Sequence, residues 1–205
     1  MGLTLCETIL YVLIFFFGAG IFFFLNIIIY RVSRKFSFVT EIFGGIQALL
    51  SALWFEKYEV AVTVFAFLCV LYVVTLMDIS TMEIEDGCHI AILIIALISL
   101  FTMPETGFVA RLIGAFCISV PLLLITVLVP GSFGGGDIKL MAACGLFLGW
   151  KLALVSAFLA FLLGSAYGIY LLAAKKADRK TRFAFGPFLC VGMEIGLLWG
   201  QKLIQ

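Results

Sequence analysis

The chain has 205 residues, of which 64% are hydrophobic, and its mean hydropathy is +1.26. Soluble domains are about 45–50% apolar, so this composition excludes a soluble globular protein and indicates an integral membrane protein in contact with lipid. The formal net charge of +1 points to no class of partner, and we expect no nucleic acid among the partners.

Apolar segments fill the chain and predict an all-α, polytopic membrane helix bundle with about eight transmembrane helices. A helix that spans a bilayer needs about 20 residues, and the sixth segment is shorter than that. We expect residues 1–205 to form a single membrane-embedded domain. The eight segments are 5–30, 36–55, 60–77, 88–103, 108–129, 138–150, 152–174 and 187–204.

The basic residues predict the topology, because lysine and arginine concentrate in cytoplasmic loops. No basic residue precedes the first segment, whereas Arg31, Arg34 and Lys35 follow it. We therefore expect the N-terminus outside, no cleaved signal peptide and the first loop in the cytoplasm. Seven of the eight crossings precede the basic loop 175–182, which places it in the cytoplasm as well.

Two aspartates follow apolar segments: Asp78 ends the third and Asp137 follows the fifth. Two crossings separate them, so both are predicted at the cytoplasmic edge of the membrane. Paired carboxylates can hydrolyse a peptide, one as general base on water and the other, protonated, polarising the carbonyl. The pair predicts an aspartic protease that needs no metal. The structural alternatives are an N-cap for Asp137 and a polar helix end for Asp78.

Three glycines, Gly134, Gly135 and Gly136, precede Asp137. Glycine permits positive φ and close approach of another chain, which a substrate strand beside the carboxylate would need. A plain turn explains the same letters. Lys139 could tune Asp137 or hold substrate carbonyls, although a lysine that snorkels to the interface is slightly favoured.

The loop after Asp78 carries Glu83, Glu85 and Asp86, which we expect to be solvated charges that could attract a basic substrate segment. Asp86 could also cap the fourth helix. His89 is predicted to be a packing or interfacial histidine rather than a ligand or a base.

Other polar residues lie in or near apolar segments. Intramembrane acids are candidates for function, which applies to Glu41 at the cytoplasmic edge and to Glu194 nearer the midplane. Asn26 is a candidate for hydrogen bonding between helices. The six cysteines form no C-x-x-C pair and the chain has one histidine, so we expect no metal and no cofactor.

Motifs in a fixed order also resemble a known family, the type IV prepilin peptidases, which are prokaryotic membrane aspartic endopeptidases. The residues that carry the resemblance are 24–26 with Tyr30 and Arg31, Glu41, Asp78 with Ile84 and Asp86, 134–140 followed by Gly145 and Gly149, and 185–189.

The resemblance implies removal of a short basic leader peptide from prepilins or pseudopilins at the cytoplasmic face of the inner membrane. It makes Asp78 and Asp137 the catalytic pair, with residues 134–136, Lys139 and Glu41 binding substrate or shaping the site. Many members also N-methylate the new terminus with S-adenosylmethionine.

Two departures from the family pattern stand out. Long members have a cysteine-rich loop between the first two helices, whereas about nine residues, 32–40, stand here without a cysteine. N-methylation and any zinc are therefore in doubt. Glu85 replaces the proline usual before the loop aspartate, which changes the loop but neither catalytic carboxylate.

Two other functions compete with this one. Presenilin-like and signal peptide peptidase-like proteases share a Gly-x-Gly-Asp element, but Met77 stands in place of their tyrosine and Phe188 follows Pro187. A small transporter would place its acids near the midplane, where Glu194 fits better than Asp78. The sequence predicts no oligomeric state.

Overall fold

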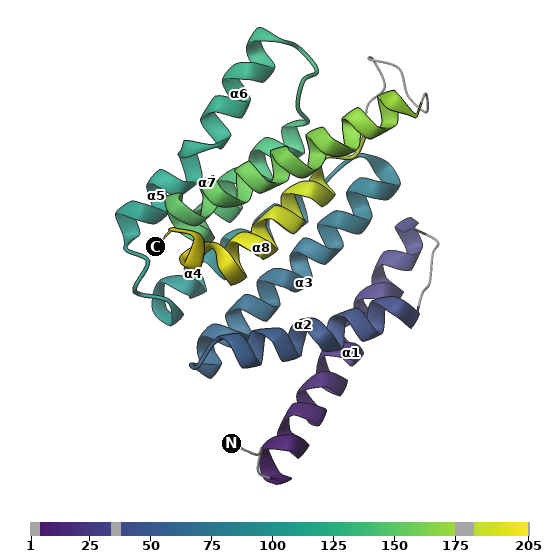
Figure 1. Ribbon diagram of the computed structural model, residues 1–205, viewed down its shortest axis with the longest axis vertical. Coiled ribbons are helices and arrows are strands. Elements are labelled where there is room, and N and C mark those ends of the chain that lie inside the picture. The colour runs from purple at the N-terminus through teal and green to yellow at the C-terminus, as the bar shows by residue number, and fades with distance from the viewer. Residues whose placement is uncertain (1–4, 34–37, 175–182, 205) are drawn as a thin grey trace. The chain divides into compact units, whose positions relative to one another are not determined.

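The computed structural model describes residues 5–33, 38–174 and 183–204, and every regular element in these ranges is a helix (Figure 1). The predicted all-α membrane bundle is confirmed. The helices are α1 (Leu5–Ser33), α2 (Phe38–Trp54), α3 (Tyr58–Thr81), α4 (Asp86–Thr102), α5 (Phe108–Cys117), α6 (Ser119–Leu128), α7 (Gly135–Ala173) and α8 (Gly186–Ile204).

Within the described ranges, four helical stretches are long and apolar enough to cross a membrane, and three shorter apolar helices accompany them. The long stretches are Glu7–Ile28, Tyr58–Thr81, Phe108–Leu128 and Gly135–Ala173. Arg34, Lys35 and the loop 175–182 lie outside the described residues, so the predicted orientation stays a prediction.

The chain divides into two compact units, Met1–Val73 and Val74–Gln205, and the boundary falls inside α3. The prediction of a single domain is left as a prediction. In the first unit α1 packs closely on α2, because a Cβ on Gly18 would lie 2.6 Å from the Gly44 carbonyl oxygen. Asn26 accepts a 2.8 Å hydrogen bond from the Tyr72 hydroxyl and donates one to Thr40, which confirms its predicted role between helices.

The fifth predicted segment is broken into two helices, α5 and α6, at Ile118. Pro121 explains the break, because it has no N–H to donate to the carbonyl of Cys117 and its ring crowds that carbonyl. The prediction of one continuous helix over 108–129 is therefore wrong at this point, although both parts are helical.

The sixth and seventh predicted segments are joined in α7, whose 39 residues would extend about 58 Å if straight. Gly149 interrupts the helix with φ 75° and ψ 166°, a conformation that side-chain-bearing residues rarely adopt. The rings of Phe133 and Phe161 lie 5.9 Å apart, so the second arm (150–173) folds back beside the first (135–148). The two arms match the two predicted segments.

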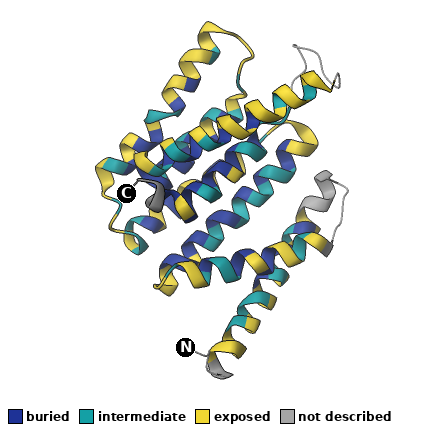
Figure 2. Ribbon diagram, viewed as in Figure 1, coloured by how far each residue is buried: buried dark blue, intermediate teal, exposed yellow. Residues whose placement is uncertain are grey.

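Glycines allow the helices of the second unit to pack backbone against backbone. A Cβ on Gly114 of α5 would lie 2.3 Å from the carbonyl oxygen of Gly145 in α7, and one on Gly192 of α8 would lie 2.4 Å from that of Ser156. Small residues serve the same purpose in other membrane bundles. In Figure 2, buried residues run along α4, α7 and α8, whereas α6 exposes mostly apolar residues, as expected of a lipid-facing surface.

Arg111 of α5 is fully buried and fastens the ends of two helices. Its guanidinium donates to the carbonyls of Ser99 and Met103 at the end of α4 and to those of Leu146 and Phe147 just before Gly149. It also donates to the Ser99 hydroxyl and the Thr106 carbonyl. A cation is favourable at helix C-termini, where carbonyls lack helical partners.

Candidate active site

Asp78 lies near the end of α3 and is buried, with 5% of its surface exposed. Its Oδ2 accepts a 2.7 Å hydrogen bond from the backbone N–H of Gly186, the first residue of α8. A Cβ on Gly186 would lie 2.7 Å from that same oxygen, so only glycine allows this approach. A helix N-terminus favours negative charge, so this hydrogen bond offsets part of the cost of burying the carboxylate.

Asp137 lies in the first turn of α7 and is also buried. The helix begins after Gly134, which is its N-cap, so the predicted N-cap role of Asp137 is wrong. Its carboxylate instead accepts a hydrogen bond from the backbone N–H of Gly134, as the residue at the N3 position of a capping box does. It is also close enough to Asp78 for the two charges to interact.

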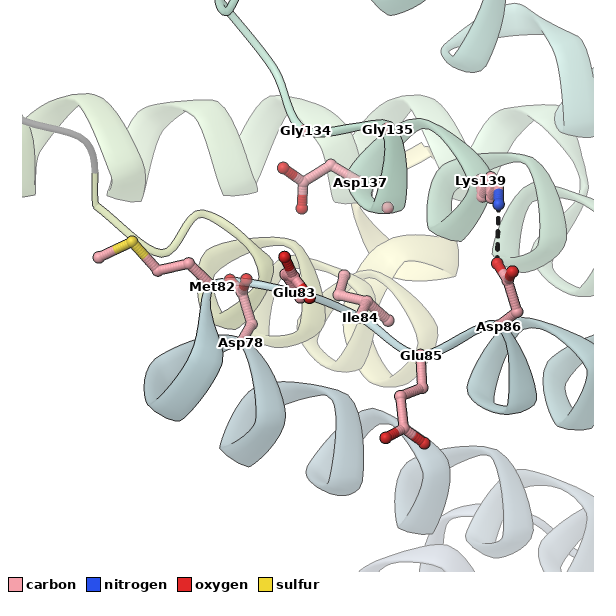
Figure 3. Close-up of a pocket in the computed structure, with 11 residues that line it drawn as sticks. Asp78, Met82, Glu83, Ile84, Glu85, Asp86, Gly134, Gly135, Asp137 and Lys139 are labelled. Atoms are coloured by element: carbon pink, nitrogen blue, oxygen red, sulfur yellow. Dashed lines mark hydrogen bonds and ion pairs between the residues drawn. The ribbon is translucent and has the colours of Figure 1, made fainter. Parts of the chain in front are cut away.

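Both aspartates line one cavity of about 420 Å³ (Figure 3). Figure 3 shows Asp78 on the side of the cavity formed by the end of α3 and Asp137 on the side formed by the start of α7. The cavity is acidic, since five of its eleven lining residues are aspartate or glutamate. They are Asp78, Met82, Glu83, Ile84, Glu85, Asp86, Gly134, Gly135, Gly136, Asp137 and Lys139.

The three glycines before Asp137 line this cavity, but none has a positive φ, so that part of their predicted role is wrong. The three positions differ in how much room a side chain would have. A Cβ on Gly136 would lie 3.3 Å from Cβ of Ile84, and one on Gly134 would lie 3.2 Å from Oδ2 of Asp137. A Cβ on Gly135 would meet nothing within 4 Å, so the wall is open at this position.

Lys139 and Asp86 both line the cavity and are paired, with their Nζ and Oδ1 atoms 2.7 Å apart (Figure 3). Both side chains are largely exposed. Asp86 opens α4 without capping it, since Glu85 is the N-cap and makes no side-chain cap bond. The prediction of a solvated charge at Asp86 is confirmed, and its possible role as a cap is not.

His89 is buried in the first turns of α4, in agreement with its prediction as a packing residue. Its Nε2 lies 3.0 Å from the carbonyl oxygen of Gly136, so it bonds to the glycine segment itself. This contact was not predicted from the sequence. The spacing of Asp86 and His89, one helical turn apart, is the signal that could have grouped them.

Phenylalanines connect the two loops that support the aspartates. Phe133 precedes Gly134, Phe185 precedes Gly186, and their rings lie 5.8 Å apart. Phe161 of α7 contacts both, at 5.9 Å and 5.5 Å between ring centroids. The aromatic side chains therefore hold the two loops beside one another.

The model of the type IV leader peptidase family matches residues 64–169, a region that contains both aspartates and the residues between them. The chain belongs to this family. The resemblance seen in the sequence is confirmed. No solved structure gives a significant match.

Curated leader peptidases give the same result. The chain is 29% identical over 139 residues to the prepilin leader peptidase/N-methyltransferase of Bacillus subtilis, an alignment that covers 68% of the chain and 56% of that protein. The protein of the same name from Stutzerimonas stutzeri is 28% identical over 138 residues, with coverages of 65% and 48%. That from Legionella pneumophila is 36% identical over 72 residues, with coverages of 35% and 25%. The chain thus spans about half the length of the longest-matching relatives.

Glu41 and Glu194 of this leader peptidase family member are not among the residues that line the cavity. Glu41 is in the first unit, in the first turn of α2, and its buried Oε1 has no hydrogen-bond partner among the described residues. Its part in the site stays a prediction. Glu194 is half-buried in α8 and interacts electrostatically with Cys190, but it does not line the cavity.

A metal has no obvious site in the part of the chain that the structure describes, where no three histidine, cysteine or acidic side chains form a cluster. The acidic cavity offers no aromatic ring to stack on an adenine base, so its residues do not fit S-adenosylmethionine.

Proposed function

We propose that this chain is a membrane aspartic endopeptidase that removes the basic leader peptide from prepilin-like proteins at the cytoplasmic face of a prokaryotic inner membrane. The observation that carries the proposal is the pair of buried carboxylates, Asp78 and Asp137, which interact and line one cavity. Membership of the leader peptidase family favours this function over a presenilin-like protease or a transporter.

Each carboxylate accepts a backbone hydrogen bond at the start of a helix, Asp78 from Gly186 and Asp137 from Gly134. Such bonds help one member of the pair to stay ionised while the other holds the shared proton. We assign Asp78, whose bond to Gly186 is 2.7 Å long, as the general base that takes a proton from the attacking water. Asp137, holding the proton that the pair shares, donates a hydrogen bond to the scissile carbonyl oxygen.

The proton balance of the reaction closes within the pair. The water oxygen bonds to the carbonyl carbon while Asp78 receives the water proton, and a tetrahedral intermediate forms. Its C–N bond then breaks, and the departing nitrogen takes that proton from Asp78. Both carboxyl groups return to their starting states without a metal or a covalent intermediate.

The walls of the cavity support a basic, extended substrate. Glu83, Glu85 and Asp86 surround the aspartates with negative charge, which attracts a leader rich in lysine or arginine. Gly135 leaves space beside Asp137 where a substrate backbone can approach. Asp86 is paired with Lys139, which offsets the positive charge of this lysine in the cavity wall.

The test is a cleavage assay in membranes that contain a prepilin together with wild type, Asp78→Asn or Asp137→Asn. We expect the leader to be removed by wild type and retained by both variants, expressed at equal levels. Glu59→Gln is the control, because Glu59 is an exposed acid in the first turn of α3 that does not line the cavity, and this variant should still cleave. Cleavage by either asparagine variant would refute the assignment of the pair.

A further inference from the structure

Two contacts join the N-terminal turns of α4 and α7. On the outer side Lys139 binds Asp86 at 2.7 Å, and on the inner side the ring of His89 bonds to the Gly136 carbonyl at 3.0 Å. Asp86 and His89 are three residues apart, as are Gly136 and Lys139, so each pair occupies one face of its helix. The two helix starts are therefore held at two points, one exposed and one buried.

The direction of the inner bond follows from its partners. A carbonyl oxygen only accepts hydrogen bonds, so Nε2 of His89 must carry the hydrogen and donate it. The other ring nitrogen, Nδ1, is buried without a hydrogen bond and lies 3.7 Å from Oδ1 of Asp86. His89 is only 6% exposed, so water competes little for the bond, which makes it stronger than a surface hydrogen bond.

The inner bond acts next to a reacting group. Gly136 directly precedes Asp137, and the peptide plane between them transmits any shift of the Gly136 carbonyl to the Asp137 backbone. This turn of α7 contains two glycines, which stabilise a helix less than other residues do. The Nε2 hydrogen bond therefore holds a turn that would otherwise move easily.

We propose that His89 is a positioning residue that holds the Gly136 carbonyl, and with it Asp137, in the place required opposite Asp78. The inference rests on the proposed proteolytic function. His89 touches neither the substrate nor the reacting atoms, and its effect passes through the backbone. Misplacement of a reacting group by about 1 Å can cost about 100-fold in rate, so the bond matters for turnover rather than for substrate affinity.

The variants His89→Gln and His89→Asn provide the test. Their side chains carry the same amide group but differ in length. In His89→Gln the amide nitrogen can occupy the place of Nε2 and donate to Gly136, whereas in His89→Asn it corresponds to Nδ1 and falls short. We expect His89→Gln to stay within about threefold of wild-type kcat, and His89→Asn to lose at least about tenfold with KM unchanged.

Hydrogen exchange of the full-length protein in lipid provides a readout that does not depend on cleavage. His89→Asn should accelerate exchange of the amides around residues 135–138, and His89→Gln should not. If the two variants match each other in both readouts, whether both are active or both are impaired, the donor role of Nε2 is refuted. If wild type cleaves no prepilin, the proposed function fails, and the exchange pattern alone decides the role of His89.

Discussion

The backbone N–H of Gly186 donates a 2.7 Å hydrogen bond to the carboxylate of Asp78, joining residues that are 108 positions apart. The start of α8 thus supports the end of α3 at the carboxylate proposed as the base. A charge-assisted bond of this kind contributes about 1.5–3 kcal/mol in typical proteins. The proposed pair therefore depends on a glycine outside the motif that contains Asp137.

Gly186→Ala is expected to reduce cleavage by about 10- to 100-fold, because a Cβ at this position would lie 2.7 Å from Oδ2 of Asp78 and displace it. The measurement is the initial rate of leader removal in membranes at equal expression. Gly87→Ala is the control, because a Cβ there meets nothing within 4 Å, and its rate should equal that of wild type. Equal rates for both variants would contradict the supporting role of Gly186.

Gly135→Ala separates the stability of the fold from access of the substrate. The new methyl group meets nothing within 4 Å, and alanine suits a helix better than glycine by about 0.5–1 kcal/mol, so the melting temperature should hold or rise. KM should increase about tenfold or more if the substrate backbone passes this position. A variant with wild-type KM would show that the substrate approaches Asp137 from another side.

Lys139→Met tests whether Lys139 binds substrate or only Asp86. Exposed ion pairs stabilise proteins little, so loss of this pair should change both kcat and KM by less than about threefold. Steady-state kinetics with a prepilin peptide distinguish the two roles. A large rise in KM with unchanged kcat would instead support the role in holding substrate carbonyls.

Arg111→Leu is expected to destabilise the protein by about 3–5 kcal/mol, because it leaves several buried carbonyl groups without a donor. Thermal unfolding in detergent measures the effect. Arg111→Lys should fall between the leucine variant and wild type, since an ammonium group has three donors and cannot reach all the carbonyls. Removal of Lys151, which is exposed, serves as the control and should leave the melting temperature unchanged.

Hydropathy predicted most helix positions, because the bilayer requires long apolar segments. It placed the boundary between the sixth and seventh segments at Lys151, and the structure breaks the helix two residues earlier, at Gly149. It missed the break at Ile118, although Pro121 was visible in the sequence as its cause. The hydropathy of a segment predicts its length. A break in a helix depends on a single residue, which hardly changes the mean hydropathy of the segment.

The site was predictable only in part for a similar reason. Alternation of helices placed Asp78 and Asp137 on one side of the membrane, and the structure brings them to one cavity. The Gly186 donor and the His89 contact could not be predicted, because each joins helices that are distant in the sequence. The sequence does contain one indication of the Gly186 donor. A glycine followed by Pro187 at the start of an apolar segment is typical of a helix N-terminus, where backbone N–H groups are free to bind a carboxylate.

The six hydrogen bonds of Arg111 should also make the region around this residue more rigid than the region around the cavity. Two of them reach the carbonyls of Leu146 and Phe147, and Phe147 lies ten residues and about 15 Å along α7 from Asp137. Local opening is easiest where fewest bonds must break, so thermal fluctuations should concentrate around the cavity rather than around the arginine. A leader peptide could then be admitted and released by small movements of the loops there, while the far end of the helices serves as a fixed hinge.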